Sequence, residues 1–277
     1  MKQFPVENFD IEKWNLDKLH SQEDLLAVEI PLKIILVFFQ KTEAKESVFT
    51  ITMRSPGNDE ELAIGLLYSE GVINSFNEVE HIRYCIKDVT NNTIRVTLKT
   101  TTLFNKDILQ RNLMSSSSCG VCGKQTVEHL SSCFVKTEIS SPIGISTIVN
   151  LPNKLKENQL LFKHTGGIHA CALFTNNGKL LVLKEDIGRH NALDKVIGSQ
   201  LINSNSFKDT VIVLSGRVGF EMSQKSARAG IPIVAAIGAP TSLAVDIANK
   251  AQICLLGFVK NDAANCYSYP NYIDFDK

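Results

Sequence analysis

The sequence predicts an α/β protein built from two parts. A smaller α+β domain is expected over residues 1–112 and an α/β domain over residues 125–277, joined by a mobile CxxC loop over residues 113–124. Strand-like runs dominate the first half, whereas short apolar runs alternate with helical patterns in the second half. Between the halves, four serines lead into a stretch of glycine and cysteine with no periodicity, which indicates a loop.

The elements of the first domain follow from local patterns. Residues 30–40 and 47–53 are β-rich runs around a polar turn, which predicts a hairpin. Asn58 or Asp59 can cap a helix over residues 60–71, whose first turn is acidic. A further pair of strands is expected at residues 80–86 and 93–100.

The second domain begins with a helix expected over residues 124–134, followed by an irregular segment over 140–153. Five strands and three helices then alternate. The strands are expected at 168–175, 180–185, 210–214, 231–237 and 251–258, and the helices at 191–201, 220–229 and 242–250. Their β-α-β-α-β order at the end of the chain predicts a mostly parallel sheet covered by helices.

Composition excludes several functional classes. The chain has 277 residues, with 29 Lys plus Arg and 29 Asp plus Glu, so bulk charge cannot attract nucleic acid or an anionic membrane. The longest apolar run, residues 30–39, contains Pro31 and Lys33 and has about half the ~20 residues of a membrane span. The N-terminus lacks the features of a signal peptide. We therefore expect a cytoplasmic protein that binds neither nucleic acid nor membrane.

Cys119 and Cys122 form a CxxC motif beside Lys124 and an expected helix start. Helix N-terminal amides and a nearby ammonium both favour thiolate over thiol, so one of these sulfurs is expected to be nucleophilic at neutral pH. The other five cysteines are dispersed, which does not resemble a disulfide framework. Two inert thiols, or a zinc site completed by His129 and Cys133, are the alternatives.

Four glycine-containing turns lie at the ends of expected strands of the second domain. They cover residues 165–167, 186–190, 215–217 and 238–242. Three of them can converge on one crevice, because ligands of α/β sheets bind where the carboxyl ends of strands meet helix N-termini. Arg189, His190 and Arg217 would supply charge and hydrogen bonds to phosphate or a base edge. In the alternative interpretation, Arg189 pairs with Asp186 or Asp194 and the glycines serve only tight turns.

Several sequence blocks are specific enough to indicate a family. They are RSPGNDEELAIG from Arg54, SSCGVCGK from Ser117, TGGIHA from Thr165, EDIGRHNALDK from Glu185, LSGRVGFEM from Leu214, AGIPIV from Ala229 and APTSLA from Ala239. These blocks resemble the formate dehydrogenase accessory sulfurtransferases, the FdhD family. They span nearly the whole chain in the expected order.

The resemblance implies a cytoplasmic homodimer whose C-terminal domain has a cytidine-deaminase-like fold that has lost deaminase chemistry. It implies a sulfurtransferase that accepts persulfide sulfur from a cysteine desulfurase. The sulfur would pass to the molybdenum cofactor, in its bis(molybdopterin guanine dinucleotide) form, that the catalytic subunit of formate dehydrogenase requires. The family's persulfide-carrying cysteine maps to Cys119, with Cys122 as its partner.

The resemblance also places cofactor binding on the stretch Phe258, Val259, Lys260, Asn261, Asp262 and Ala263, with guanine nucleotide as a surrogate ligand and no metal ligands. Here the chain departs from its family, because Ala263 and Ala264 replace the usual Arg-Phe before Asn265. Phosphate contacts would then come from Lys260 or the strand-end turns. The alternative class is a non-catalytic cofactor chaperone whose CxxC holds a metal or a disulfide.

Overall fold

A computed structural model of the chain describes residues 4–16, 18–40, 43–86, 88–102, 134–137 and 139–275. The expected CxxC loop, with Cys119 and Cys122, lies outside these described residues. So does nearly all of the helix expected over residues 124–134.

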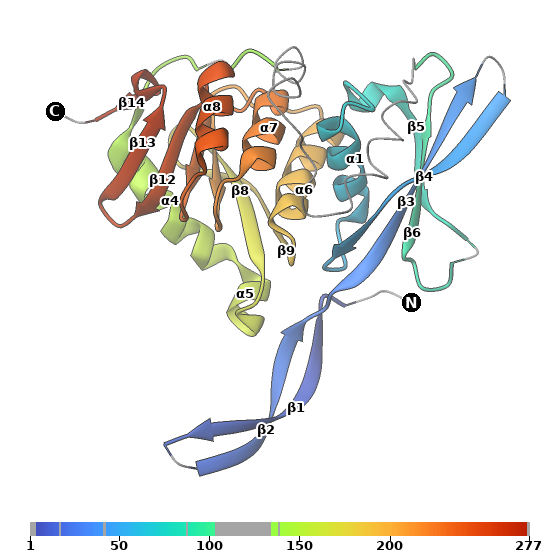
Figure 1. Ribbon diagram of the computed structural model, residues 1–277, viewed down its shortest axis with the longest axis horizontal. Helices are drawn as coiled ribbons and strands as arrows, with labels where there is room; N and C mark the ends of the chain where they lie inside the picture. The colour runs from blue at the N-terminus through green and yellow to red at the C-terminus, as the bar shows by residue number, and fades with distance from the viewer. Residues whose placement is uncertain are drawn as a thin grey trace.

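A six-stranded sheet forms the centre of the second half, in the order β13-β12-β11-β10-β8-β9 (Figure 1). The strands are β8 (His169–Thr175), β9 (Leu180–Asp186), β10 (Thr210–Leu214), β11 (Ile233–Ala236), β12 (Cys254–Lys260) and β13 (Ala263–Ser268). Only the β10–β11 and β11–β12 pairings are parallel. The prediction of a mostly parallel sheet is therefore wrong. Short turns join β8 to β9 and β12 to β13, and a short turn can connect only antiparallel neighbours.

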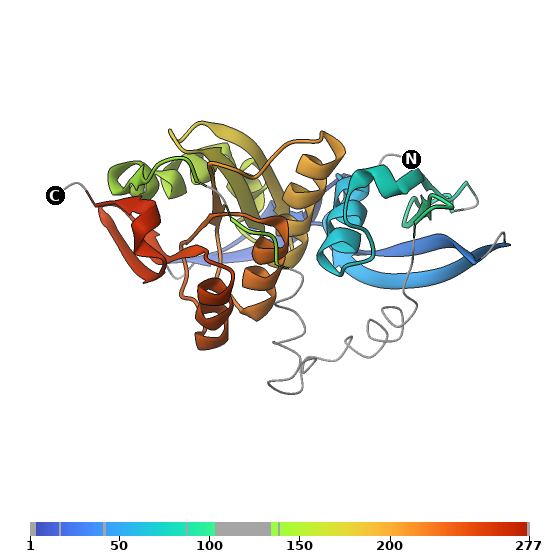
Figure 2. The same cartoon turned by 90° about the horizontal axis from the view of Figure 1, so that it is seen from above.

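Helices cover both faces of this sheet. On one face lie α6 (Arg189–Ile202), α7 (Phe220–Ala229) and α8 (Ser242–Lys250), and on the other lies α4 (Ile145–Asn158), as Figure 2 shows from above. A separate hydrophobic cluster lies on each face of the sheet, and the side chains of successive strand residues point alternately into one cluster and the other. Leu173 packs with the α6 side, for example, and Phe174 with the α4 side. Both faces are thus buried, which explains why these strands are nearly continuous apolar runs.

The segment expected to be irregular, residues 140–153, is mostly helix. After the short β7 (Ile143–Gly144), α4 begins at Ile145 and contains Pro152 in its interior. Proline removes one backbone donor and normally disfavours a helix interior. Ile148, Leu151 and Leu155 nevertheless lie on one buried face at helical spacing, and this burial outweighs the local preference.

The first half contains a second sheet, in the order β4-β3-β6-β5. Its strands are β3 (Ile30–Gln40), β4 (Glu43–Arg54), β5 (Val79–Tyr84) and β6 (Thr93–Leu98). The two expected strand pairs are confirmed, and α1 (Asp59–Ser69) confirms the expected helix within two residues at each end. The remaining elements are η1 (Phe76–Glu78), α5 (Leu160–Thr165), η2 (Pro270–Tyr272) and β14 (Ile273–Asp274).

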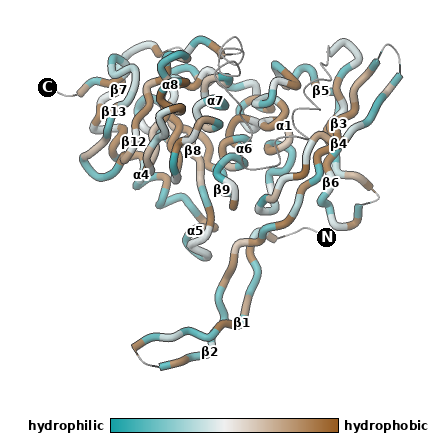
Figure 3. The backbone as a smooth tube through the Cα atoms, in the orientation of Figure 1, coloured by the Kyte–Doolittle hydropathy of each residue, from teal (hydrophilic) through white to brown (hydrophobic). Residues whose placement is uncertain are grey.

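An N-terminal hairpin, β1 (Val6–Asn15) with β2 (Lys18–Ala27), extends away from the rest of the molecule (Figure 1). It was not predicted, because most of its side chains are exposed on both faces and no apolar side stands out. Figure 3 shows hydrophobic and hydrophilic residues mixed along both of its strands.

The two halves share one continuous hydrophobic core through the contact between α1 and α6. The helix backbones meet at two glycines. A Cβ atom at Gly65 would lie 1.8 Å from the carbonyl oxygen of Asp194, and one at Gly198 would lie 1.9 Å from the carbonyl oxygen of Glu61. Only glycine fits at this crossing. The domain boundary at residue 112 stays a prediction.

We expect Gly198→Val to destabilise the protein strongly, because the new side chain must push α6 away from α1. Overpacking of this kind costs about 1–3 kcal/mol, and the upper end applies where the obstacle is backbone. Urea denaturation would measure the loss. Gly167→Val is the matched control, since a Cβ there meets only one atom, at 3.7 Å. Equal midpoints for the two variants would contradict the packing.

Among the described residues, no helix is both long enough and apolar enough to cross a membrane.

Candidate functional site

Three of the four predicted turns meet at one end of the six-stranded sheet. The Ser215 hydroxyl accepts a 2.9 Å hydrogen bond from the Ala170 amide and lies 3.5 Å from Nδ1 of His169. The Gly238 amide donates to the Gly216 carbonyl, and the Phe258 amide donates to the Gly238 carbonyl, each at 3.2 Å. We call the residues His169, Arg189, Ser215, Gly216, Arg217, Gly238 and Phe258 the strand-end cluster. The expected convergence is confirmed.

Glycine is required inside the strand-end cluster for close packing. A Cβ at Gly216 would lie 3.3 Å from Cε1 of His169 and 3.9 Å from Cδ of Arg189, so both side chains rest against this glycine. A Cβ at Gly238 would lie 2.9 Å from the Arg217 amide nitrogen. At Gly238 the turns therefore approach one another more closely than a larger residue permits.

A buried polar network fixes the turn over residues 186–190. Asp186 is fully buried and forms a 2.6 Å ion pair with Lys195. Its other oxygen accepts hydrogen bonds from the Gly188 amide, at 2.9 Å, and from the Asn191 side chain, at 3.0 Å. Lys195 also donates to the Ser55 carbonyl at 3.1 Å, which ties this turn to the first half of the chain.

Arg189 does not pair with either of the carboxylates that the sequence offered. Asp186 is bound to Lys195, and Asp194 is bound to Lys225 at 2.7 Å. The Nε atom of Arg189 is buried and has no hydrogen-bond partner among the described residues. Arg189 is also the first residue of the 14-residue helix α6, where free amides and the helix dipole favour an anion. The alternative interpretation of Arg189 as a partner of these carboxylates is therefore wrong.

The two histidines at the site are less basic than usual. Burial, reinforced by the charge of Arg189, lowers the pKa of His169. Burial also lowers the pKa of His190, although Glu221, 3.1 Å away, opposes the shift. At pH 7 both rings are therefore neutral hydrogen-bonding groups. Positive charge at the site comes from Arg189 and from Arg217, which is exposed and forms no ion pair among the described residues.

The predicted cofactor segment, residues 258–263, starts at the strand-end cluster and leads away from it. Phe258 has a left-handed backbone with φ 54° and a side chain that is 46% exposed. Val259 is fully buried in the core, so only its backbone can reach a ligand. The other four residues, Lys260, Asn261, Asp262 and Ala263, are exposed on the turn between β12 and β13. Asn261 accepts a 3.2 Å hydrogen bond from Asn153.

The structure does not test the CxxC chemistry, because Cys119, Cys122 and the alternative ligands His129 and Cys133 lie outside the described residues. Within the described part of the chain, no group of three or more His, Cys, Asp or Glu side chains could hold a metal ion.

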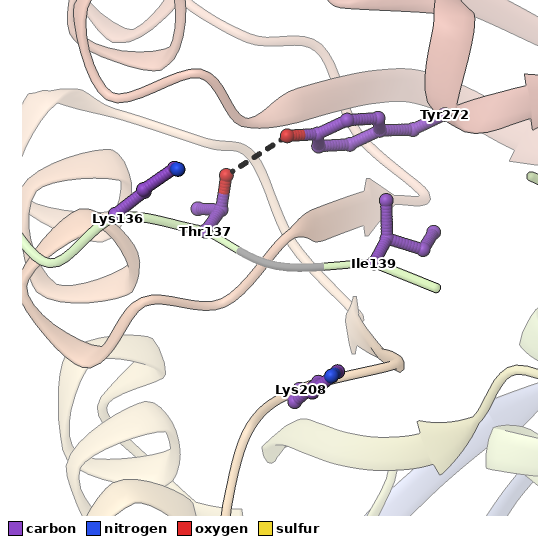
Figure 4. A pocket seen from close by; sticks show the side chains of 5 residues that line it. All are labelled: Lys136, Thr137, Ile139, Lys208 and Tyr272. Carbon is purple, nitrogen blue, oxygen red and sulfur yellow. Dashed lines mark hydrogen bonds between the residues drawn. The ribbon is translucent and has the colours of Figure 1, made fainter. Parts of the chain in front are cut away.

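Two hollows in the surface lie away from the strand-end cluster. One, of about 310 Å³, is lined by Lys136, Thr137, Ile139, Lys208 and Tyr272, and the Thr137 and Tyr272 oxygens are 3.1 Å apart (Figure 4). Lys208 precedes β10, so this hollow lies at the amino end of that strand, opposite the cluster. The other, of about 590 Å³, is lined mainly by α4. Neither contains a residue of the cluster or of the segment 258–263.

Sequence reasoning missed part of this site. Ser215, His169 and the Asp186–Lys195 pair were not assigned site roles, although all lie in or beside the glycine-containing turns. The acid–base pattern within residues 185–195 was the available signal. A charged pair nine residues apart cannot form along one helix face, but it can join a strand end to the helix that follows.

The described geometry defines an α/β protein whose strand ends bring together glycine turns, a helix N-terminus and an arginine unpaired within the described chain, features that favour an anion. The model of the FdhD/NarQ family matches residues 29–274, and the chain belongs to that family.

Named relatives align with almost the full length of this chain. The sulfur carrier protein FdhD of Saccharolobus solfataricus is 41% identical over 271 residues, covering 97% of this chain and 98% of the relative. The protein of the same name from Corynebacterium efficiens is 43% identical over 265 residues, covering 90% and 91%. The fold also matches the crystal structure described as that of a formate dehydrogenase accessory protein from Desulfotalea psychrophila. That match has a TM-score of 0.75 and 24% identity, covering 97% of this chain and 99% of the other.

Proposed function

We propose that this chain is a cytoplasmic, homodimeric sulfurtransferase. It accepts persulfide sulfur from a cysteine desulfurase and transfers it to the molybdenum cofactor, in its bis(molybdopterin guanine dinucleotide) form, required for formate dehydrogenase activity. The observation that carries the proposal is the 41% identity, over 97% of the chain, to a protein named as a sulfur carrier. The CxxC motif at Cys119 supplies a thiol for that role.

The chemistry assigned to Cys119 is thiol exchange. Its thiolate attacks the outer sulfur of the donor persulfide, a new S–S bond forms, and the donor cysteine leaves as a thiolate. The outer sulfur then remains on Cys119. In its later transfer, an electron pair of the acceptor forms the new bond to that sulfur, the S–S bond breaks, and Cys119 leaves as a thiolate. Cys122 acts as the partner thiol.

The cofactor is the cargo of this reaction, and the strand-end cluster with residues 258–263 is its proposed binding site. The guanine dinucleotide arms carry phosphate charges, whereas the chain has a formal net charge of zero. Binding must therefore rest on local donors. Arg189, Arg217, Lys260 and the N-terminus of α6 are the candidates, and the Arg189 Nε atom that lacks a partner within the described chain supports this choice.

We expect Arg217→Ala and Lys260→Ala each to weaken binding of guanosine diphosphate, used as the surrogate ligand. Losing one charged contact to phosphate costs about 1.5–3 kcal/mol, which is roughly a 10- to 100-fold loss of affinity. The difference from wild type should shrink at high salt. Calorimetry measures the affinities. Lys250→Ala, at the exposed end of α8, is the control. Unchanged affinity in both site variants would exclude these two residues as phosphate contacts.

Mass spectrometry tests the sulfur-transfer role directly. After incubation with a cysteine desulfurase and cysteine, the peptide that contains Cys119 should gain about 32 Da, the mass of one sulfur. The competing proposal is a cofactor chaperone whose CxxC holds a metal or a disulfide. That proposal predicts guanine nucleotide binding with no sulfur gain, and such a result would reject the sulfurtransferase.

A further inference from the structure

Two cysteine side chains meet at the β13 edge of the six-stranded sheet. Cys254 is the first residue of β12 and Cys266 lies in β13, and their sulfur atoms are 4.0 Å apart. Among the described cysteines, only these two form such a contact; Cys85 and Cys171 are the others. The pair is separate from the CxxC motif and has no part in the proposed sulfur transfer.

An irregularity in strand pairing aims Cys266 at its neighbour. Leu255 pairs with Ser268 but Leu256 pairs with Cys266, so Tyr267 is an extra residue on β13. Such a bulge redirects the side chains beside it. Cys266 consequently packs against the core cluster that contains Cys254. Closing a disulfide requires the two sulfurs, which are 4.0 Å apart, to approach to about 2.0 Å.

The two thiols differ in reactivity. Cys254 is fully buried, whereas Cys266 is half-buried on an edge strand. The hydrogen bond from Cys254 lowers the pKa of Cys266 to about 7. The same hydrogen bond and burial raise the pKa of Cys254. Cys266 is therefore the first of the pair to ionise and the one that a small molecule can reach.

We propose that Cys254 and Cys266 are a redox-active pair that closes into a reversible disulfide when the protein meets a small-molecule disulfide. The Cys266 thiolate attacks one sulfur of the reagent, whose S–S bond breaks, and one small thiolate leaves. The Cys254 thiol then attacks the Cys266 sulfur, and the second small thiolate leaves and takes up the Cys254 proton. The protein loses two electrons and two protons, and the reagent is reduced to two thiols.

This disulfide would fasten the hairpin that carries residues 258–263. The hairpin already packs on the strand-end cluster, because a Cβ at Gly257 would lie 3.3 Å from the Gly238 carbonyl oxygen and the Phe258 amide donates to that oxygen. A covalent link between β12 and β13 would restrict its movement. The effect on cofactor binding rests on the proposed function, whereas the disulfide itself does not.

The test uses the reduced, full-length protein and oxidised glutathione. After alkylation in denaturant, peptide mass spectrometry should find the Cys254 and Cys266 peptides linked, about 2 Da below the sum of the two reduced peptides. Cys254→Ala should retain glutathione on Cys266, because no second thiol displaces it. Cys266→Ala should leave Cys254 free to be alkylated. Cys85→Ala is the matched control and should form the same link as wild type.

Finding both cysteines alkylated in the wild type, or no glutathione on Cys266 in Cys254→Ala, would overturn the proposal.

Amide hydrogen exchange over residues 258–265 should slow in the oxidised protein, and unchanged exchange would overturn the restriction of the hairpin. Repeating the experiment in Cys119→Ala keeps the two proposals distinguishable. The link should still form there, whatever the outcome of the persulfide assay.

Discussion

Asp186→Ala is expected to destabilise the protein by about 3–5 kcal/mol, the usual cost of leaving one member of a buried ion pair alone. The Lys195 side chain is 2% exposed and would lose its carboxylate partner without gaining access to water. The Gly188 amide and the Asn191 side chain would lose their acceptor as well. Urea denaturation followed by circular dichroism measures the loss.

Two further variants identify the cause of that loss. Asp246→Ala removes an exposed carboxylate from α8 and should change stability by less than about 0.5 kcal/mol. Asp186→Ala combined with Lys195→Met removes both charges and should recover part of the stability, since the uncompensated charge is the main penalty. A double variant less stable than Asp186→Ala would contradict this, and would show that Lys195 stabilises the turn through its hydrogen bonds to the Ser55 and Glu185 carbonyls.

The central elements of the second half were predictable because their signals are local. The bounds of β10, α7 and α8 agree with the sequence prediction at both ends. Each is a short apolar or amphipathic run bounded by glycine, proline or a capping residue. Thr241, for example, caps α8 by accepting a hydrogen bond from the Ala244 amide.

The elements that the sequence did not predict depend on long-range contacts rather than on local patterns. The N-terminal hairpin buries little, so no hydrophobic pattern marks its strands. Helix α4 contains a proline, and its helical state depends on packing against the sheet. Whether neighbouring strands of the sheet run parallel or antiparallel depends on which of them are joined by short turns. Local patterns describe none of these long-range contacts.

In the candidate site, too, local features were predictable and contacts set by the fold were not. Glycine turns after apolar strands located the strand-end cluster correctly. The partners of its charged residues could not be read from spacing, because Arg189 lies within reach of both Asp186 and Asp194 along the chain. The choice is made by Lys225, which belongs to α7 and reaches Asp194 only in the folded protein. Arg189 is left available because Lys195 pairs with Asp186 and the more distant Lys225 pairs with Asp194.

Cys119→Ala should abolish persulfide formation in the presence of a cysteine desulfurase and cysteine. Without this thiol the proposed sulfur acceptor is missing, and the gain of about 32 Da should be absent from the peptide that contains position 119. The fold should be nearly unaffected, because a thiol on the loop expected over residues 113–124 would contribute little to a core. Mass spectrometry of the intact protein and of its peptides gives the result.

Guanosine diphosphate binding is the control for that variant, because the proposal assigns sulfur acceptance and phosphate binding to different residues. The proposed phosphate contacts are Arg189, Arg217, Lys260 and the N-terminus of α6, whereas the proposed sulfur acceptor is Cys119. Cys119→Ala should therefore bind the nucleotide as wild type does, and Arg217→Ala should still form the persulfide. If Cys119→Ala lost nucleotide affinity as well, the loop would be part of the ligand pocket. Sulfur acceptance and cofactor binding would then belong to one site.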